Sequence, residues 1–100
     1  MFMNNIEKFL PLGTVCLLKD AKKKIMVIGY LPMSIDENKE EKLYDYMGCI
    51  YPEGIISTDK SLLFNHQDIE KVFYIGYKDD ELKEFNKKLI DTLENYNNMN

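Results

Sequence analysis

The chain has 100 residues, with 17 acidic and 13 basic side chains and a formal net charge of -4. This length predicts one domain, which can bury roughly 65% of its unfolded surface and needs no disulfide to hold a core. Every basic residue is lysine. Arginine supplies the planar fork that recognises phosphate and guanine, so its absence argues against sequence-specific nucleic-acid recognition.

The two cysteines, Cys16 and Cys49, lie in apolar, strand-like runs. We expect free buried thiols; the alternatives are a bridge or a metal pair, although zinc would need more cysteine or histidine ligands. Residues 1–10 show no apolar core of signal-peptide length, and no run approaches the roughly 20 apolar residues that span a bilayer. We therefore expect a cytoplasmic protein.

The first predicted elements are an N-terminal arm and a core hairpin. The arm, residues 1–10, has apolar side chains at helical spacing that could dock on the domain. These are Ile6, Phe9 and Leu10. The apolar runs 12–18 and 25–30 flank a polar turn and predict a hairpin whose second strand is covered on both faces. The lysine run 22–24 is expected to solvate the hairpin tip, with a weak anionic contact as the alternative.

The acidic stretch 33–41 predicts an exposed loop of variable conformation, the segment most prone to disorder. After it, the β-prone stretch 43–51 predicts one long strand around which the sheet is built. Gly48 in its middle indicates a bend, a bulge or a close approach, as do Gly29 and Gly76 in other strands. Three such glycines predict a tightly coiled sheet.

A turn at 51–54, with proline second and glycine fourth, is expected to end the long strand. Residues 62–64 then form a second hairpin or return beside that strand. Asn65 is a good N-cap, and an acid three residues later predicts one helical turn at 66–70. The β-branched and aromatic run 72–77 predicts a strand in the interior of the sheet.

A helix is predicted at residues 79–96, with aspartates at its cap and an apolar stripe along one face. The stripe consists of Leu82, Phe85, Leu89, Leu93 and Tyr96. It packs on the sheet or on a partner; a homodimer through it is an alternative, unless the internal core uses the whole stripe. The tail, 95–100, is expected to fray.

These elements predict an α+β fold. We expect a strongly coiled antiparallel sheet of about five strands with a C-terminal amphipathic helix, an SH3-like partial closure being one form of such a sheet. Residues 1–100 form one domain, made of the arm at 1–10, a β-rich core at 12–77 and the helix at 79–96.

Motifs for catalysis or cofactor binding are not found: the chain has no glycine-rich phosphate loop, paired histidines or CxxC. His66, the only histidine, is expected to be a structural hydrogen-bonding residue. Asp45 should bond a tyrosine hydroxyl or a turn amide, because acid catalysis would need a second carboxylate and a cleft. Glu53 is the other acid beside the apolar runs. A small hydrolase would need a reactive centre, so we expect no enzyme, no metal and no cofactor.

The aromatic residues suggest a protein-binding surface, since tyrosine combines apolar area with a polar tip. The candidate partner-binding residues are Tyr44, Tyr46, Tyr51, Phe64, Tyr74 and Tyr77. Core packing is expected to use about two of the tyrosines. Tyr44, Tyr46 and the exposed aromatic side chains near Phe64 are the predicted contacts.

Three stretches of the chain carry a resemblance to a known family. They are Leu10-Pro11-Leu12-Gly13-Thr14-Val15 with Ile25-Met26-Val27-Ile28-Gly29 after the lysine-rich turn, Tyr44-Asp45-Tyr46-Met47-Gly48-Cys49-Ile50-Tyr51-Pro52-Glu53-Gly54, and Leu63-Phe64-Asn65-His66-Gln67-Asp68-Ile69. In order and spacing they resemble the family called domain of unknown function 4176, over residues 10–82. The arm and the final helix match only in character.

Members of that family are small proteins of Gram-positive bacteria, encoded among type VII secretion genes and their LXG toxins. The resemblance implies a cytosolic chaperone or adaptor that binds a toxin or its targeting helices before export. Strand addition at a sheet edge and a groove between sheet and helix are both possible binding modes, and a helical target favours the groove. The alternative is an immunity protein that blocks the toxin, for which the acidic loop 36–41 is the relevant feature.

Overall fold

The computed structural model describes residues 9–57 and 61–99, so most of the predicted arm, Ile6 included, lies outside the described residues. The strands are β1 (Val15–Leu18), β2 (Ile25–Tyr30), β3 (Met33–Ile35), β4 (Glu41–Leu43), β5 (Tyr46–Ile50), β6 (Leu62–Phe64) and β7 (Ile69–Tyr74). A 3-10 turn, η3 (His66–Asp68), precedes β7, and a helix, α1 (Asp80–Met99), follows it.

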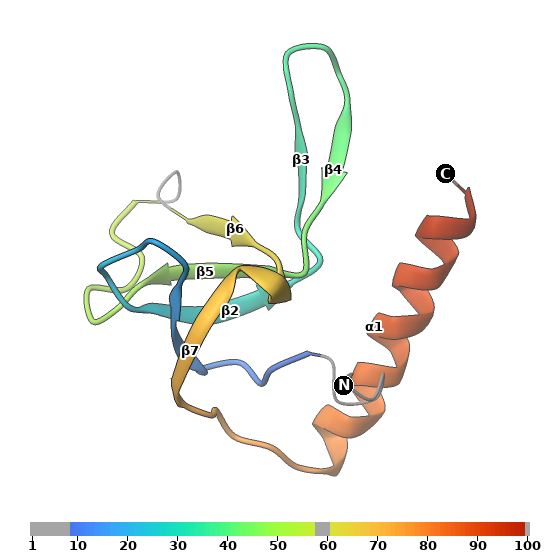
Figure 1. Ribbon diagram of the computed structural model, residues 1–100. Coiled ribbons are helices and arrows are strands. Elements are labelled where there is room, and N and C mark those ends of the chain that lie inside the picture. The colour runs from blue at the N-terminus through green and yellow to red at the C-terminus, as the bar shows by residue number, and fades with distance from the viewer. Residues whose placement is uncertain (1–8, 58–60, 100) are drawn as a thin grey trace.

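The fold is α+β, as predicted. Five strands form an antiparallel sheet in the order β6-β5-β2-β1-β7, and β3 pairs with β4 in a separate two-stranded sheet. The edge strands β6 and β7 do not pair with each other, so the sheet is open and the SH3-like partial closure is not formed. Figure 1 shows this sheet, with the β3–β4 hairpin projecting from one end and α1 lying to the side.

The predicted core hairpin is confirmed, and β2 has the predicted bounds. β1 pairs with β2 through Val15 opposite Met26 and Cys16 opposite Ile25. Ile25 and Val27 are buried, and the remaining residues of β2 are half-buried, so both faces of the strand are largely covered.

The stretch 43–51 is not one strand, contrary to the prediction. β4 ends at Leu43, β5 begins at Tyr46, and the two residues between them carry the chain from the small sheet to the large one. Here the Tyr44 N–H donates to the Pro32 carbonyl, and the Leu31 N–H donates to the Asp45 carbonyl. Backbone bonds to a crossing segment thus replace ladder bonds, which residue propensities alone do not reveal.

The acidic stretch 33–41 is exposed, as predicted, but it forms an ordered hairpin. Met33 lies opposite Leu43 and Ile35 opposite Glu41. Asp36 caps the turn, because its Oδ1 accepts the N–H groups of both Asn38 and Glu40 at 2.9 Å. An Asx turn of this kind needs a short acidic side chain, so the polarity that suggested disorder stabilises the hairpin.

β7 is an edge strand, whereas its apolar sequence predicted an interior one. It pairs only with β1, and every residue after Ile69 is exposed. It also begins at Ile69 and ends at Tyr74, three residues before the predicted end. The strand therefore presents apolar side chains to solvent, a feature that marks interaction surfaces in soluble proteins.

The predicted strand glycines have different roles. At Gly48 an added Cβ would lie 2.6 Å from Ile25 Cγ2 and 2.9 Å from Phe64 Cε1, so the residue permits close packing of two core side chains. At Gly29 the pairing of β2 with β5 shifts register, as a bulge does. The turn after β5 contains a cis Tyr51–Pro52 peptide and ends at Gly54, whose φ is +77.

Gly76 lies beyond the end of β7, where the chain crosses the segment that precedes β1. A Cβ on this residue would overlap the carbonyl oxygen of Leu12. The Gly76 N–H donates to Thr14 Oγ1 at 3.1 Å, and Thr14 is fully buried. The close backbone approach thus joins two segments that are 62 residues apart in the chain.

The core lies between the sheet, the segment before β1 and one face of α1. It contains Phe9, Cys16, Ile25, Val27, Tyr46, Phe64 and Leu89. Both cysteines are free and buried, which confirms the prediction. Within the described part of the chain, no helix is long and apolar enough to cross a membrane.

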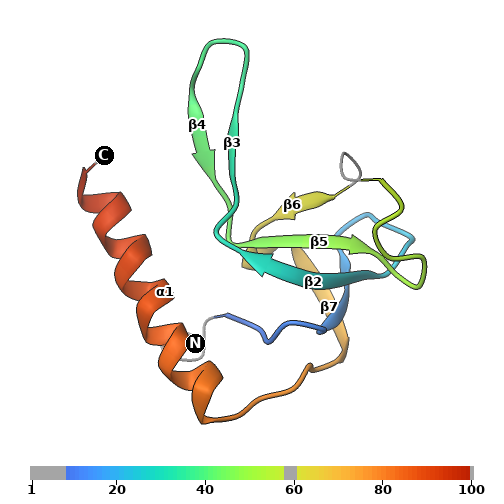
Figure 2. The ribbon, with the colours of Figure 1, turned by 180° about the vertical axis from the view of Figure 1, so that it is seen from behind.

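Helix α1 spans Asp80–Met99, so residues 95–99 of the predicted tail continue the helix, and Asn100 lies outside the described residues. Only Asn86 and Leu89 are buried on it. Of the predicted stripe, Phe85 is largely exposed, while Leu82, Leu93 and Tyr96 are half-buried. Figures 1 and 2 agree in placing the segment before β1 between the first turns of α1 and the sheet.

Candidate partner-binding surface

The segment before β1 is fixed by two tyrosines from neighbouring strands. Tyr46 Oη accepts the N–H of Leu10 at 3.0 Å, and the hydroxyl of Tyr30 donates to the Leu10 carbonyl at 2.7 Å. The Phe9 ring packs edge-on against both tyrosine rings, with centroids 5.7 and 6.0 Å apart. Both backbone groups of Leu10 are therefore satisfied by side chains, which positions the segment as a wall beside the sheet.

Burial changes the acidity of both tyrosines. Burial raises the pKa of Tyr30 to about 12 and also raises that of Tyr46. The hydroxyls therefore stay protonated at neutral pH, and Tyr30 keeps the proton that it donates to the Leu10 carbonyl. Burial likewise raises the pKa of the Cys16 thiol. None of these groups is an activated nucleophile or base.

Polar groups in and around η3 form a hydrogen-bond network that includes the Tyr46 hydroxyl. Its Oη lies 3.0 Å from His66 Nδ1, and the His66 N–H donates to Asp45 Oδ2 at 2.9 Å. Asn65 Oδ1 accepts the Asp45 N–H, and the Asn65 N–H donates to Asp68 Oδ2. The predicted helical turn at 66–70 is present as the 3-10 turn His66–Asp68, and residues 69 and 70 belong to β7 instead. His66 takes part in hydrogen bonds, and Asp45 bonds a turn amide, as predicted.

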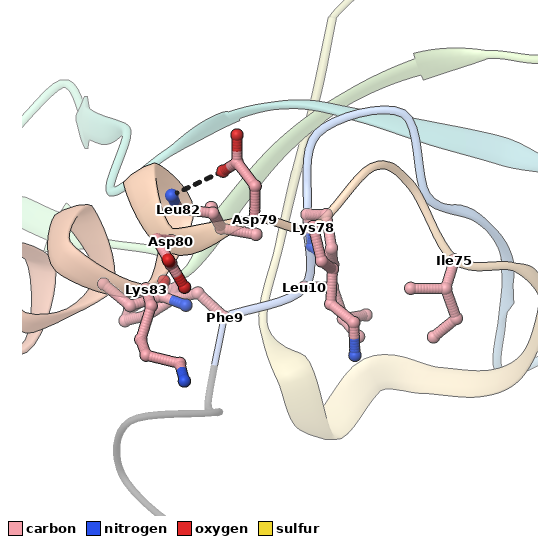
Figure 3. Close-up of a pocket in the computed structure, with 10 residues that line it drawn as sticks. Phe9, Leu10, Ile75, Lys78, Asp79, Asp80, Leu82 and Lys83 are labelled. Carbon is pink, nitrogen blue, oxygen red and sulfur yellow. Dashed lines mark hydrogen bonds between the residues drawn. The ribbon is translucent and has the colours of Figure 1, made fainter.

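Helix α1 begins beside the segment before β1 (Figures 1 and 2). Asp79 caps it, since its Oδ1 accepts the N–H of Leu82 at 3.0 Å, drawn as a dashed line in Figure 3. A cavity of about 460 Å³ lies between the helix start, the segment 9–11 and the residues after β7. Figure 3 shows Phe9, Leu10 and Ile75 around it.

Asn86 lies in the wall of this cavity and is 5% exposed. Its Oδ1 is buried and has no hydrogen-bond partner among the described residues. A buried polar atom without a partner costs free energy on folding, about 1–3 kcal/mol. We therefore expect an apolar residue at this position to attach α1 more firmly than asparagine does.

On the other side of the same helix turns lies an apolar groove of about 800 Å³. We call it the β2–α1 groove. It is lined by Leu12, Ile28, Gly29, Tyr30, Asp80, Glu81, Leu82, Glu84, Phe85 and Lys88. Leu12 is 52% exposed and Phe85 46% exposed. The Phe85 ring packs against Tyr30, with centroids 6.1 Å apart. The groove is therefore already formed in the unbound protein, as most ligand clefts are.

The exposed edge strand β7 and the residues after it form a second apolar surface. It consists of Val72, Phe73, Tyr74, Ile75 and Tyr77. Two irregularities in its pairing with β1 distort this edge, and such bulges hinder the addition of another strand. The Phe73 ring already has two ammonium groups near its face, those of Lys24 at 5.1 Å and Lys71 at 5.0 Å. The β2–α1 groove is the better docking surface.

The predicted partner-binding residues do not gather at one place. Tyr46 is 0% exposed and Phe64 2% exposed, so both belong to the core and neither can contact a partner on the surface. Gly48 leaves room for the Phe64 ring. The remaining four are at the surface. Tyr51, Tyr74 and Tyr77 are exposed, whereas Tyr44 is half-buried with Lys42 Nζ 5.1 Å from its ring.

The groove residues were not among the predicted site residues. Leu12 was assigned to a strand and Phe85 to a packed helix stripe, and nothing in their spacing shows that they stay half-exposed. The one available signal was the number of apolar positions on the helix, which is larger than its contact with the sheet can bury.

The charged side chains outside the two apolar surfaces are candidates for ion pairs and metal ligands. Lys23 and Glu53 form an exposed ion pair at 3.1 Å, and the hydrogen bond from Lys23 lowers the pKa of that carboxyl. The lysine run 22–24 is exposed, as expected of a hairpin tip. In the described ranges, no three histidine, cysteine or acidic side chains are grouped so that they could hold a metal ion.

The fold and its surface define a class of protein: a small α+β domain with an open antiparallel sheet and one helix, with an apolar groove between the helix and β2. A family model described as domain of unknown function (DUF4176) matches residues 9–92, and the chain belongs to this family. No curated protein and no solved structure shows a significant match to the chain.

Proposed function

We propose that the protein is a non-enzymatic accessory protein of the cytoplasm, a chaperone or adaptor for an LXG-type toxin of a type VII secretion system. The β2–α1 groove is the observation that carries this proposal, because a preformed apolar groove with half-exposed Leu12 and Phe85 suits a protein partner. The secretion context comes from the family resemblance of the sequence.

The test is co-expression with the neighbouring LXG toxin, divided into its N-terminal targeting half and its C-terminal toxic half. Co-purification with the targeting half supports the chaperone or adaptor. Co-purification with neither half refutes it.

The alternative is an immunity protein that binds the toxic half and neutralises it. The β3–β4 hairpin favours this alternative, since it projects from the sheet and carries Asp36, Glu37, Glu40 and Glu41. A basic enzymatic domain could be bound through such a patch. Capture by the toxic half with loss of toxicity would establish this role, and charge reversal in the hairpin should then restore toxicity.

A further inference from the structure

The chemistry of the β2–α1 groove specifies its occupant. We propose that it binds an amphipathic helix of another protein, with large aliphatic side chains on one face and lysine or arginine flanking them. This inference rests on the proposed function, for which it names the binding site and the class of partner segment.

A helix is the favoured occupant because the groove has no free sheet edge. Its sheet side is β2, which pairs with β5 as far as Tyr30 on one side. On its other side, beyond the pairing with β1, the segment before β1 runs beside it and exchanges backbone hydrogen bonds with Val27. An extended segment lying there would find no ladder bonds for its own N–H and C=O groups, and burying them unpaired is costly. A helix satisfies its backbone internally and needs only an apolar surface.

The apolar surface is held in place by backbone contacts. The Gly13 N–H donates to the Val27 carbonyl at 2.8 Å, and Gly76 packs against the backbone of Leu12. Tyr30 is fixed by its hydrogen bond to the Leu10 carbonyl. The exposed part of Leu12 is thus presented on a rigid segment, so binding costs little ordering of the site.

The rim of the groove selects a basic partner. Three carboxylates, those of Asp80, Glu81 and Glu84, line it together with one ammonium group, that of Lys88. Glu84 is paired with Lys87 at 3.2 Å, but Asp80 and Glu81 form no ion pair within the part of the chain that the structure describes. Basic residues beside the apolar face of a docked helix would meet these two exposed carboxylates, which attract them and disfavour an acidic helix.

The test uses the full chain and three synthetic peptides of about 18 residues, five helical turns. The first places leucines on one face and lysines on the other. The second replaces lysine with glutamate, and the third shuffles the first so that leucines lie all round the helix. We expect the leucine–lysine helix to bind at least about tenfold more tightly than the other two, with an affinity that falls as salt is raised. Equal binding of the lysine and glutamate helices would overturn the charge selection.

Variants of the protein locate the site. Neutralising the two unpaired rim carboxylates with Asp80→Asn and Glu81→Gln should weaken binding of the leucine–lysine helix about fivefold, which corresponds to the loss of two exposed ion pairs. The matched control, Asp91→Asn with Glu94→Gln, changes the same net charge on exposed positions of the same helix outside the groove, and should leave the affinity unchanged. Equal weakening by both pairs would show attraction by net charge alone and refute the site.

The apolar part is tested by Leu12→Ala, expected to weaken binding about tenfold or more because a central apolar anchor is lost. Ile56→Ala, on an exposed aliphatic residue outside the groove, is its control. The outcomes separate the two proposals. A toxin half that binds Leu12→Ala as tightly as it binds the wild type refutes the groove and leaves the chaperone standing, whereas peptide binding without toxin capture refutes the chaperone and leaves the groove.

Discussion

Replacing Tyr46 with phenylalanine should destabilise the fold by about 2 kcal/mol while keeping the ring in place. The ring is fully buried and stacks on Phe64 with centroids 5.3 Å apart, so its packing is retained in the variant. The hydroxyl is lost. The Leu10 N–H would lose its acceptor at 3.0 Å, and His66 Nδ1 would lose its neighbour at the same distance. A buried group left without a partner costs about 1–3 kcal/mol, and a lost hydrogen bond about 1 kcal/mol.

Thermal and urea unfolding followed by circular dichroism measure this change. For a domain of this size a loss of about 2 kcal/mol lowers Tm by roughly 8–16 °C. Tyr77→Phe is the matched control, because Tyr77 is 79% exposed and its change should stay within about 0.5 kcal/mol. If Tyr46→Phe is as stable as that control, the two tyrosines do not hold the segment before β1 in the way we describe.

Three further results are expected. Gly48→Ala should destabilise by about 1–3 kcal/mol in urea unfolding, because its Cβ would meet Ile25 at 2.6 Å; a neutral effect would show that the core can shift. Asn86→Leu should raise Tm, since it removes the partnerless Oδ1, and a lower Tm would mean that the amide is satisfied. Burial raises the pKa of Tyr30 from 10.0 to about 12. The stability that its protonated hydroxyl contributes to the fold is therefore fully present below pH 10 and is lost as the pH rises to about 12. Urea unfolding across this range should show wild-type stability falling more steeply than that of Tyr30→Phe, and parallel curves would contradict the raised pKa.

Local pattern was sufficient where a segment interacts mainly with its sequence neighbours. β2, the turn at Asn65 and the C-terminal helix follow from apolar periodicity, a capping residue and the placement of acids near a helix start. The β3–β4 hairpin was not predicted because its stability comes from one Asx turn rather than from burial. Composition alone cannot separate such a hairpin from a disordered acidic loop.

The features that the sequence did not predict depend on contacts between distant parts of the chain. The sequence of β7 is as apolar as that of an interior strand, yet the strand lies at the edge of the sheet. β2 occupies one side of β1 and β7 the other, and no other strand of the described residues pairs with the far side of β7. Tyr46 and Phe64 were expected at a binding surface, but cross-strand pairing places them opposite each other in the core. The exposure of Leu12 depends on where Gly76 crosses it, which is a contact between distant parts of the chain.

The bond between Gly76 and Thr14 also bears on the order of folding. It spans 62 residues, and closing a loop of that length costs about 4 kcal/mol of chain entropy. An isolated helix forms within about a microsecond, but the return of β7 to β1 is what brings α1 to Tyr30, against which its Phe85 ring packs. We therefore expect the β2–α1 groove to be completed late in folding. A partner that recognises it would engage the finished protein and not a partly folded chain.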